Sequence, residues 1–191
     1  MEVMLKKVRV SWPAIYAPKA MKGDASSNPA YGGKLIVEPD SENDKTLWNA
    51  MSKVAEEKWP GKGAQVLAKL IADKRVAYVR GPYLDNDNEP REGFEGMYYL
   101  SCRSEKLKPT VKDRFNNTVV ESDVGAPYAG CYVHAAVEVY AYDDSAWGRR
   151  INCNLQGVMF AADGPAFGGG RPATDSTFAG LAAEVSNEDF V

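Results

Sequence analysis

The sequence has little of what most metalloenzymes and secreted proteins use. Among its 191 residues there are one histidine, His134, and three cysteines. A metal site built on several histidines is therefore excluded, and no pair of cysteines has the short spacing of a zinc site. Cys102, Cys131 and Cys153 are odd in number and widely spaced, and each falls within an expected strand. We therefore expect buried thiols in a reducing cytoplasm.

Long apolar runs are also missing. No stretch is long enough to cross a bilayer as a helix, and residues 1–7 lack the apolar core of a signal peptide. The sequence thus predicts no membrane partner.

No group of residues supports catalysis. In the acidic stretch 85–95, Pro90 stands where a calcium loop needs glycine, and Gly96 follows where it needs glutamate. The glycines at 168–170 lack the lysine and hydroxyl of a phosphate-binding loop. A nuclease would need a carboxylate cluster at strand ends, which cannot be assembled here. A mid-strand histidine such as His134 is more often a hydrogen-bonded surface residue than a general base, so the sequence predicts no catalysis, cofactor or metal.

What the sequence does contain is a pair of alternating strands, at 131–142 and 150–160, joined by the turn 143–148. Period-two alternation is typical of strands with one buried and one exposed face. The expected inward set is Cys131, Val133, Ala135, Val137, Val139 and Ala141, followed by Ile151, Cys153, Leu155, Gly157 and Met159. Val158 and Phe160 are then expected to point outward. Inward side chains of this modest size suit a small barrel.

The opposite face of the two strands has flat rings and hydrogen-bonding groups. It carries Tyr132, His134, Tyr140, Tyr142, Arg150 and Asn152, with Trp147 in the turn. Two interpretations stay open: an ordinary solvated face, or a platform on which nucleic-acid bases stack.

Charge is unevenly distributed along the chain. The formal net charge is −3, which argues against a uniformly basic nucleic-acid binder. Between residues 103 and 114, however, basic residues outnumber acidic ones; they are Arg103, Lys106, Lys108, Lys112 and Arg114. Acidic residues dominate 38–57. A segregated surface of this kind can hold DNA despite an acidic total.

The rest of the chain predicts a mainly β protein, a β-barrel with inserted helices similar to an OB-fold. Further strands are expected at 5–16, 34–37, 76–79 and 97–103, and helices between about 41 and 73. In the first strand Val8, Val10 and Trp12 are expected to share a face, and Pro13 to loosen or end the strand. We expect one domain over 1–172, followed by a C-terminal segment, 173–191, with an acidic end.

Several short motifs, in order over most of the chain, support this interpretation. They are Arg9–Pro13, Lys108–Arg114, Tyr128–Val133, Asp163–Gly164 and Phe167–Gly170. Together they resemble a family of bacteriophage single-stranded DNA-binding proteins. The resemblance implies an OB-fold barrel, a role in phage DNA replication or recombination, and the cytoplasm of the infected bacterial host. It also implies an acidic C-terminal tail that contacts partner enzymes, although here only Glu188 and Asp189 are acidic after Val185.

We therefore expect a protein that binds single-stranded DNA without sequence preference. Bases would stack on the aromatic residues, and the Lys and Arg side chains would contact the DNA backbone. A non-enzymatic phage structural or assembly protein with the same barrel and no affinity for DNA is the alternative. The sequence leaves the oligomeric state open, a homodimer included.

Overall fold

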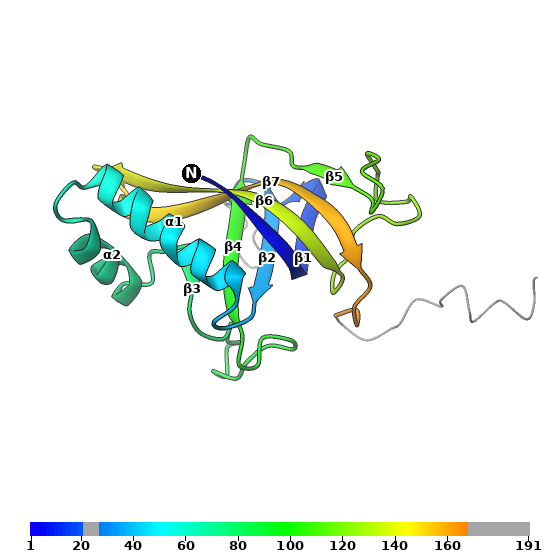
Figure 1. Ribbon diagram of the computed structural model, residues 1–191, viewed down its shortest axis with the longest axis horizontal. Coiled ribbons are helices and arrows are strands. Elements are labelled where there is room, and N and C mark those ends of the chain that lie inside the picture. The colour runs from blue at the N-terminus through cyan, green and yellow to red at the C-terminus, as the bar shows by residue number, and fades with distance from the viewer. Residues whose placement is uncertain (21–26, 168–191) are drawn as a thin grey trace, which may run out of the picture.

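The computed structural model of the protein describes residues 1–20 and 27–167 (Figure 1). Within these ranges the strands are β1 (Glu2–Lys19), β2 (Ala30–Val37), β3 (Tyr78–Val79), β4 (Tyr98–Ser104), β5 (Thr110–Lys112), β6 (Tyr132–Asp144) and β7 (Gly148–Ala162). The helices are α1 (Glu42–Lys58) and α2 (Gly63–Ala72), and they follow β2 in the region where the sequence predicts them. The C-terminal segment 173–191 lies outside the described residues, so the domain boundary at 172 stays a prediction.

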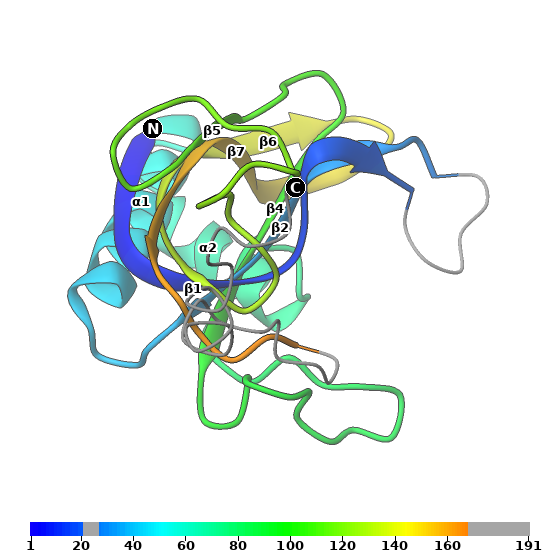
Figure 2. The ribbon, with the colours of Figure 1, turned by 90° about the vertical axis from the view of Figure 1, so that its right-hand side faces the viewer.

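All the strands belong to one curled sheet (Figure 2). Its order is β3-β4-β2-β1-β6-β7-β5, and only the β5–β7 pair is parallel. The sheet is not closed, since no ladder joins β4 to β7. Instead the segment before β3 spans this seam: the Ala77 N–H donates to the Ile151 carbonyl at 2.8 Å, and the Ser101 N–H donates to the Ala77 carbonyl at 2.9 Å.

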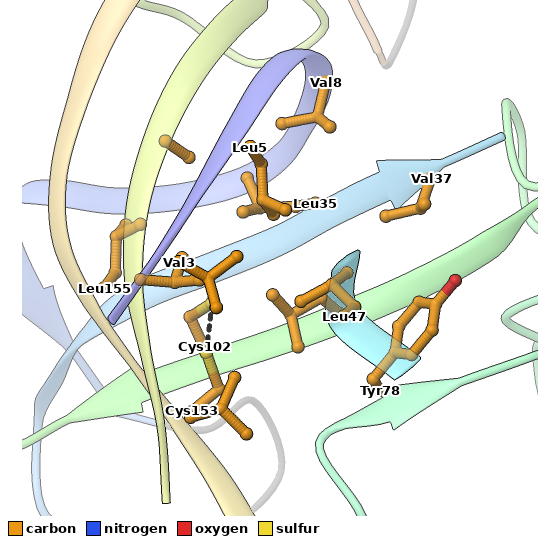
Figure 3. Close-up of a cluster of buried hydrophobic side chains, with 14 of the residues drawn as sticks. Val3, Leu5, Val8, Leu35, Val37, Leu47, Tyr78, Cys102, Cys153 and Leu155 are labelled. Atoms are coloured by element: carbon orange, nitrogen blue, oxygen red, sulfur yellow. Dashed lines mark hydrogen bonds between the residues drawn. The ribbon is translucent and has the colours of Figure 1, made fainter. Parts of the chain in front are cut away.

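A shared apolar core holds the curled sheet together across the seam. The inward side chains of β6 and β7 meet those of β1, β2 and β4, and Leu47 of α1 lies at one end of the core (Figure 3). At the seam itself the sulfur atoms of Cys102 and Cys153 are 3.6 Å apart. Burying one large aliphatic side chain contributes about 1.5–3 kcal/mol. At the seam, where β4 and β7 are not paired as strands, the packing of this core therefore holds the two edges of the sheet together.

The start of α1 is fixed to the sheet by one buried carboxylate. The Ser41 hydroxyl caps the helix by accepting a hydrogen bond from the Asp44 N–H at 3.2 Å. Asp44 is 2% exposed, and its carboxylate accepts hydrogen bonds from the Tyr78 hydroxyl and the Arg80 Nε, both at 2.8 Å. These hydrogen bonds attach the first turn of α1 to Tyr78 of β3 and to Arg80 just after it.

The expectation for Trp12 is wrong. Val8 and Val10 share the buried face of β1, but Trp12 does not: it is 47% exposed and has a φ of 46°. The β1–β2 pairing shifts register between Ser11 and Ala14, because Pro13 has no N–H for the ladder and the chain bulges there. The strand continues to Lys19, so Pro13 loosens β1 without ending it.

The second half of β7 also departs from the expected alternation. Ala136 pairs with Gly157 and Val137 with Leu155, so Gln156 is an extra residue in β7. Such a bulge exchanges the two faces of a strand beyond it. Val158 and Phe160 are therefore buried, whereas Gly157 and Met159 are not, which overturns the prediction for this part of the strand. The alternation in β6, and in β7 up to Leu155, is confirmed.

Candidate nucleic-acid interface

A groove of about 700 Å³ follows the seam between β4 and β7. We call it the basic groove. Its polar and aromatic lining residues include Lys74, Arg75, Ser101, Arg103, Glu105, Lys106, Tyr140, Arg150 and Asn152. Five of these are basic and only Glu105 is acidic. The groove therefore combines an excess of positive charge with one ring, which suits a polyanion that carries bases.

The β6–β7 hairpin turn forms one end of the basic groove. The Asp144 carboxylate accepts hydrogen bonds from the N–H groups of Ala146 and Trp147, at 2.8 and 3.0 Å, and these bonds lower the pKa of Asp144. The Arg75 guanidinium donates to the Trp147 carbonyl. The turn is thus rigidly built, while the Trp147 side chain is 68% exposed and available for stacking.

The cations at the other side of the groove come from the end of β4. Arg103 donates to the Asn28 carbonyl and lies 3.6 Å from the Glu105 carboxylate. This exposed ion pair is weak, because water and salt screen both charges. Lys106 and Arg150 are exposed, and neither is in an ion pair with another described residue. Their charges are available to a bound anion.

The structure brings half of the predicted DNA-binding residues to this place. Tyr140, Arg150 and Asn152 come from the outer faces of β6 and β7, and Arg103 and Lys106 from the end of β4 and the loop after it. Trp147 stands at the adjoining turn. These residues are distant in sequence, and they meet because β4 lies against β7.

Most of the other predicted residues lie elsewhere. Tyr132 is eight residues from Tyr140 along β6, a separation of roughly 27 Å in a strand. Lys108 is exposed in the loop before β5. Tyr142, which is 37% exposed, does not line the groove but pairs with Arg150, which does. Tyr132 therefore does not share one stacking platform with Tyr140 and Tyr142.

Lys112 and Arg114 lie at the far edge of the sheet. The Lys112 ammonium donates to the Asn116 carbonyl and to the Thr118 hydroxyl, at 3.2 and 3.0 Å. The Arg114 guanidinium lies 5.2 Å from the centre of the Phe160 ring. The basic residues of 103–114 are thus divided between two places, because the loop before β5 runs from the seam near Ile151 to a more distant part of the same edge of β7, where β5 pairs with residues 157–159.

His134 borders a small apolar pit on the outer face of β6. The pit has a volume of about 170 Å³, and Met4, Met159 and Lys112 also line it. No carboxylate or thiol is among its lining residues. His134 therefore has no proton-transfer partner of that kind in the pit, and it lies apart from the basic groove.

Sequence reasoning missed a second cluster of rings and cations. We call it the aromatic cage; its members are Trp12, Lys34, Tyr83, Arg91, Phe94 and Tyr99. The Trp12 ring stacks on Phe94, with a centroid distance of 5.8 Å and an angle of 10° between the planes. The Lys34 ammonium lies 4.1 Å from the Tyr83 ring centre and 5.0 Å from that of Tyr99. The cage lies on the outer face of β1, β2 and β4.

The residues of the aromatic cage gave only a weak signal in the sequence. Tyr83, Arg91 and Phe94 belong to a loop of mixed polar residues between β3 and β4, which resembles solvated loops in composition. Alternation predicts Trp12 on the same face as Val8 and Val10, and the bulge at Pro13 places it on the opposite one. An aromatic residue next to a strand-breaking proline is the one feature that could have directed attention to Trp12.

Comparisons with known proteins identify the family of the chain. The family model described as "Enterobacter phage Enc34, ssDNA-binding protein" matches residues 1–191. The chain belongs to this family. Protein p50 of Acyrthosiphon pisum secondary endosymbiont phage 1 is 31% identical to it over 190 residues, which cover 98% of each chain.

Solved structures of other phage proteins show the same fold. The Enc34 single-stranded DNA-binding protein in complex with ssDNA matches with a TM-score of 0.69 and 22% identity, over 87% of this chain and 89% of that one. The single-stranded DNA-binding protein gp2.5 of bacteriophage T7 matches with a TM-score of 0.53 and 16% identity, over 100% of this chain and 98% of that one. The predicted OB-fold-like class is confirmed, in the form of a sheet that is not closed.

None of the described helices is long and apolar enough to span a membrane. In the same part of the chain, no three His, Cys, Asp or Glu side chains gather where they could hold a metal ion.

Proposed function

We propose that this protein binds single-stranded DNA without sequence preference during phage DNA replication or recombination in the host cytoplasm, and that it is not an enzyme. The observation that carries the proposal is the basic groove. It gathers five basic side chains against one acidic side chain, with Tyr140 in its wall and Trp147 at its end. Cations contact the phosphates, and rings stack on any base.

Membership of a family described as ssDNA-binding supports this function. So does the likeness in fold to the Enc34 protein that was solved with ssDNA. The arrangement of the groove agrees with a sequence-tolerant mode, since Arg and Lys head groups outnumber the amides that could recognise base edges. Contact with replication or recombination enzymes through the C-terminal segment is part of the proposal.

The test is a titration of fluorescent single-stranded oligonucleotides at a series of salt concentrations. The logarithm of the binding constant should fall linearly with the logarithm of the salt concentration, by about 0.7 per phosphate contacted. Oligo(dC), oligo(dT) and mixed sequences should bind within about tenfold of one another. The double variant Lys106→Gln/Arg150→Gln should weaken binding to all of them alike and reduce the salt slope by about 1.4, one contact for each charge removed.

The matched control removes the same amount of charge away from the groove. Lys53 and Lys62 are exposed, on α1 and just before α2, so Lys53→Gln/Lys62→Gln should leave affinity and salt slope unchanged. Equal effects of the two double variants would show that net charge matters and the groove does not. No binding at low salt would refute the proposed function and favour a structural or assembly protein.

A further inference from the structure

The floor of the aromatic cage is a row of three polar residues across neighbouring strands. Ser11 of β1 pairs with Lys34 of β2, and Lys34 pairs with Ser101 of β4. Residues paired in this way have their side chains on the same face of the sheet. The Lys34 ammonium donates to the Ser101 hydroxyl at 2.8 Å. The row therefore carries a positive charge at its centre.

The rings and the cation above this row come from other elements. Trp12 follows Ser11 in β1, Tyr99 precedes Ser101 by two residues in β4, and the loop before β4 supplies Tyr83 and Phe94. The same loop supplies Arg91, whose guanidinium lies 5.5 Å from the Trp12 ring centre and 5.4 Å from that of Tyr83. Lys34 and Arg91 thus both lie over the Tyr83 ring.

The hydrogen-bonding capacity of the cage is incompletely used. Arg91 Nε and Ser11 Oγ are both buried and have no hydrogen-bond partner among the described residues. In the same part of the chain, neither Lys34 nor Arg91 forms an ion pair with a carboxylate. The negative ring faces of Tyr83 and Tyr99 are what Lys34 meets instead. Partly buried cations without a counter-charge favour the arrival of an anion.

The cage adjoins the basic groove. Ser101, which accepts the hydrogen bond from Lys34, also lines the groove. The outer face of β4 thus runs from Tyr99 in the cage, past Ser101, to Arg103 in the groove. A strand of DNA that lies in the groove and continues along β4 reaches the cage.

From this arrangement we propose that the aromatic cage is a phosphate subsite, in which Lys34 and Arg91 bind a phosphodiester of the single-stranded DNA that leaves the basic groove along β4. The subsite rests on the proposed function, and it extends the path of the bound DNA from β4 to β2 and β1. Trp12 and Tyr83 flank the two cations.

The subsite makes DNA binding depend on pH. Burial, with a smaller contribution from the Arg91 charge and against an opposite effect of Cys102, lowers the pKa of Lys34 to about 8. A bound phosphate favours the charged ammonium and raises this pKa again. DNA binding then takes up a proton, so affinity is highest below pH 8 and falls as the pH rises through 8. We expect a loss of about tenfold between pH 7 and pH 9.5.

Other groups that face Lys34 do not reproduce this effect. From β1 they are Ser11 and Trp12, from β4 Tyr99, Ser101 and Cys102, and from the loop Tyr83 and Arg91. Burial raises the pKa of Tyr99, which keeps its hydroxyl neutral in this range. Arginine stays charged throughout.

The experiment measures the affinity for a short oligo(dC), whose bases stay neutral in this range, from pH 7 to 9.5 at constant ionic strength. Lys34→Arg keeps the charge at every pH, so its affinity should not change between pH 7 and 9.5. Lys34→Met should bind severalfold more weakly at pH 7, also without the pH dependence. If the wild-type slope persists in Lys34→Arg, the proposal is wrong. If the wild type binds no oligo(dC) at any pH, it is the proposed function that fails.

Two further arms complete the test. Thermal unfolding of each variant separates lost binding from lost folding, and Lys34→Arg alone decides the question if Lys34→Met does not fold. Inorganic phosphate replaces the oligonucleotide in the second arm. Stabilisation of the wild type by phosphate, together with a DNA affinity that does not vary with pH, would assign the cage to a free anion and overturn the proposal for DNA.

Discussion

Tyr140 and Tyr132 occupy the same face of β6 and differ in what surrounds them. Tyr140 pairs with Asn152 and lines the basic groove, whereas Tyr132 lies at the other end of the strand, with the Lys7 ammonium 6.0 Å from its ring centre. Sequence alternation places both residues on the outer face, and it could not tell them apart. What separates them is the position of β4, which forms the second wall of the groove beside Tyr140 only.

This difference predicts unequal effects of the same substitution. Tyr140→Ala should weaken the binding of single-stranded DNA by about 1–3 kcal/mol, because a stacking ring is lost. Tyr132→Ala, the matched control, should leave affinity nearly unchanged. Both residues are half-buried and outside the apolar core, so neither melting temperature should fall by much. Anisotropy titrations and thermal unfolding of the two variants provide the measurement; equal affinities would remove Tyr140 from the interface.

At the scale of elements, the attachment of α1 to β3 is the contact that a single substitution can break most cleanly. Asp44 accepts two side-chain hydrogen bonds from Tyr78 and Arg80, and its carboxylate also accepts one from the Asp40 N–H at 3.1 Å. Burial, and after it the hydrogen bond to Asp44, raises the pKa of Tyr78. The Tyr78 hydroxyl is therefore a neutral donor to the carboxylate at all physiological pH values.

Asp44→Ala should lower the free energy of unfolding by about 2–4 kcal/mol, because it leaves a buried hydroxyl and a half-buried guanidinium without their acceptor. DNA affinity, measured where the variant is still folded, should stay the same. Glu42→Ala is the control two residues away, where the carboxylate is exposed and contacts only Lys45. It should hardly change the unfolding midpoint in urea. A similar loss in both variants would mean that helix charge matters and the link to β3 does not.

The two bulges show which features of the strands were predictable. The positions of the long strands follow from alternation, and their observed bounds lie close to those expected. The bulges at Pro13 and at Gln156 exchange the faces of the strands beyond them, and alternation cannot reveal an extra residue that the partner strand does not match. At Gly157 one reason for the exchange of faces can be identified. The residue has no side chain, and Thr110 of β5 lies directly against it. That contact joins residues far apart in sequence, so no local pattern announces it.

At the scale of the whole molecule, the three thiols report on the integrity of the core. Cys102, Cys131 and Cys153 are buried and free, as the sequence predicts. Burial raises the pKa of Cys131 to about 11. The hydrogen bond with Cys102, together with burial, raises the pKa of Cys153 well above its usual range. Because all three thiols are buried and the thiolate is the reactive form, they should react only when the curled sheet opens.

We therefore expect an aromatic disulfide reagent to modify the native protein at pH 8 at least a hundredfold more slowly than the urea-unfolded chain. At that pH a thiol with a pKa of 11 is ionised in roughly one molecule in a thousand. Single Cys→Ser variants assign the phases, and addition of urea should accelerate all of them in parallel with global unfolding. A fast phase in the native protein that belongs to Cys102 or Cys153 would show that the seam between β4 and β7 opens by itself.

The sequence by itself determined the fold class, the approximate position of each long strand and helix, and the burial of the three cysteines. These properties follow from composition and from periods of two or 3.6 residues, which are local and can be read from neighbouring residues. The acidic stretch 38–57 and the basic stretch 103–114 were visible in the same way. Family membership was anticipated by the short motifs that resemble phage single-stranded DNA-binding proteins, and it is confirmed.

Only the tertiary structure decided which of the predicted residues act together. Arg103 and Lys106 meet Tyr140, Arg150 and Asn152 because β4 lies against β7 across a seam that one segment bridges. Lys112 and Arg114 are excluded because β5 pairs with residues 157–159 of β7, farther along the strand than the seam at Ile151. Lys34 and Arg91 meet at the Tyr83 ring because β2 pairs with β1 and β4, and the loop between β3 and β4 packs over these strands. Each of these contacts joins residues distant in sequence, and their energy depends on the packing of whole strands, which a single sequence does not display.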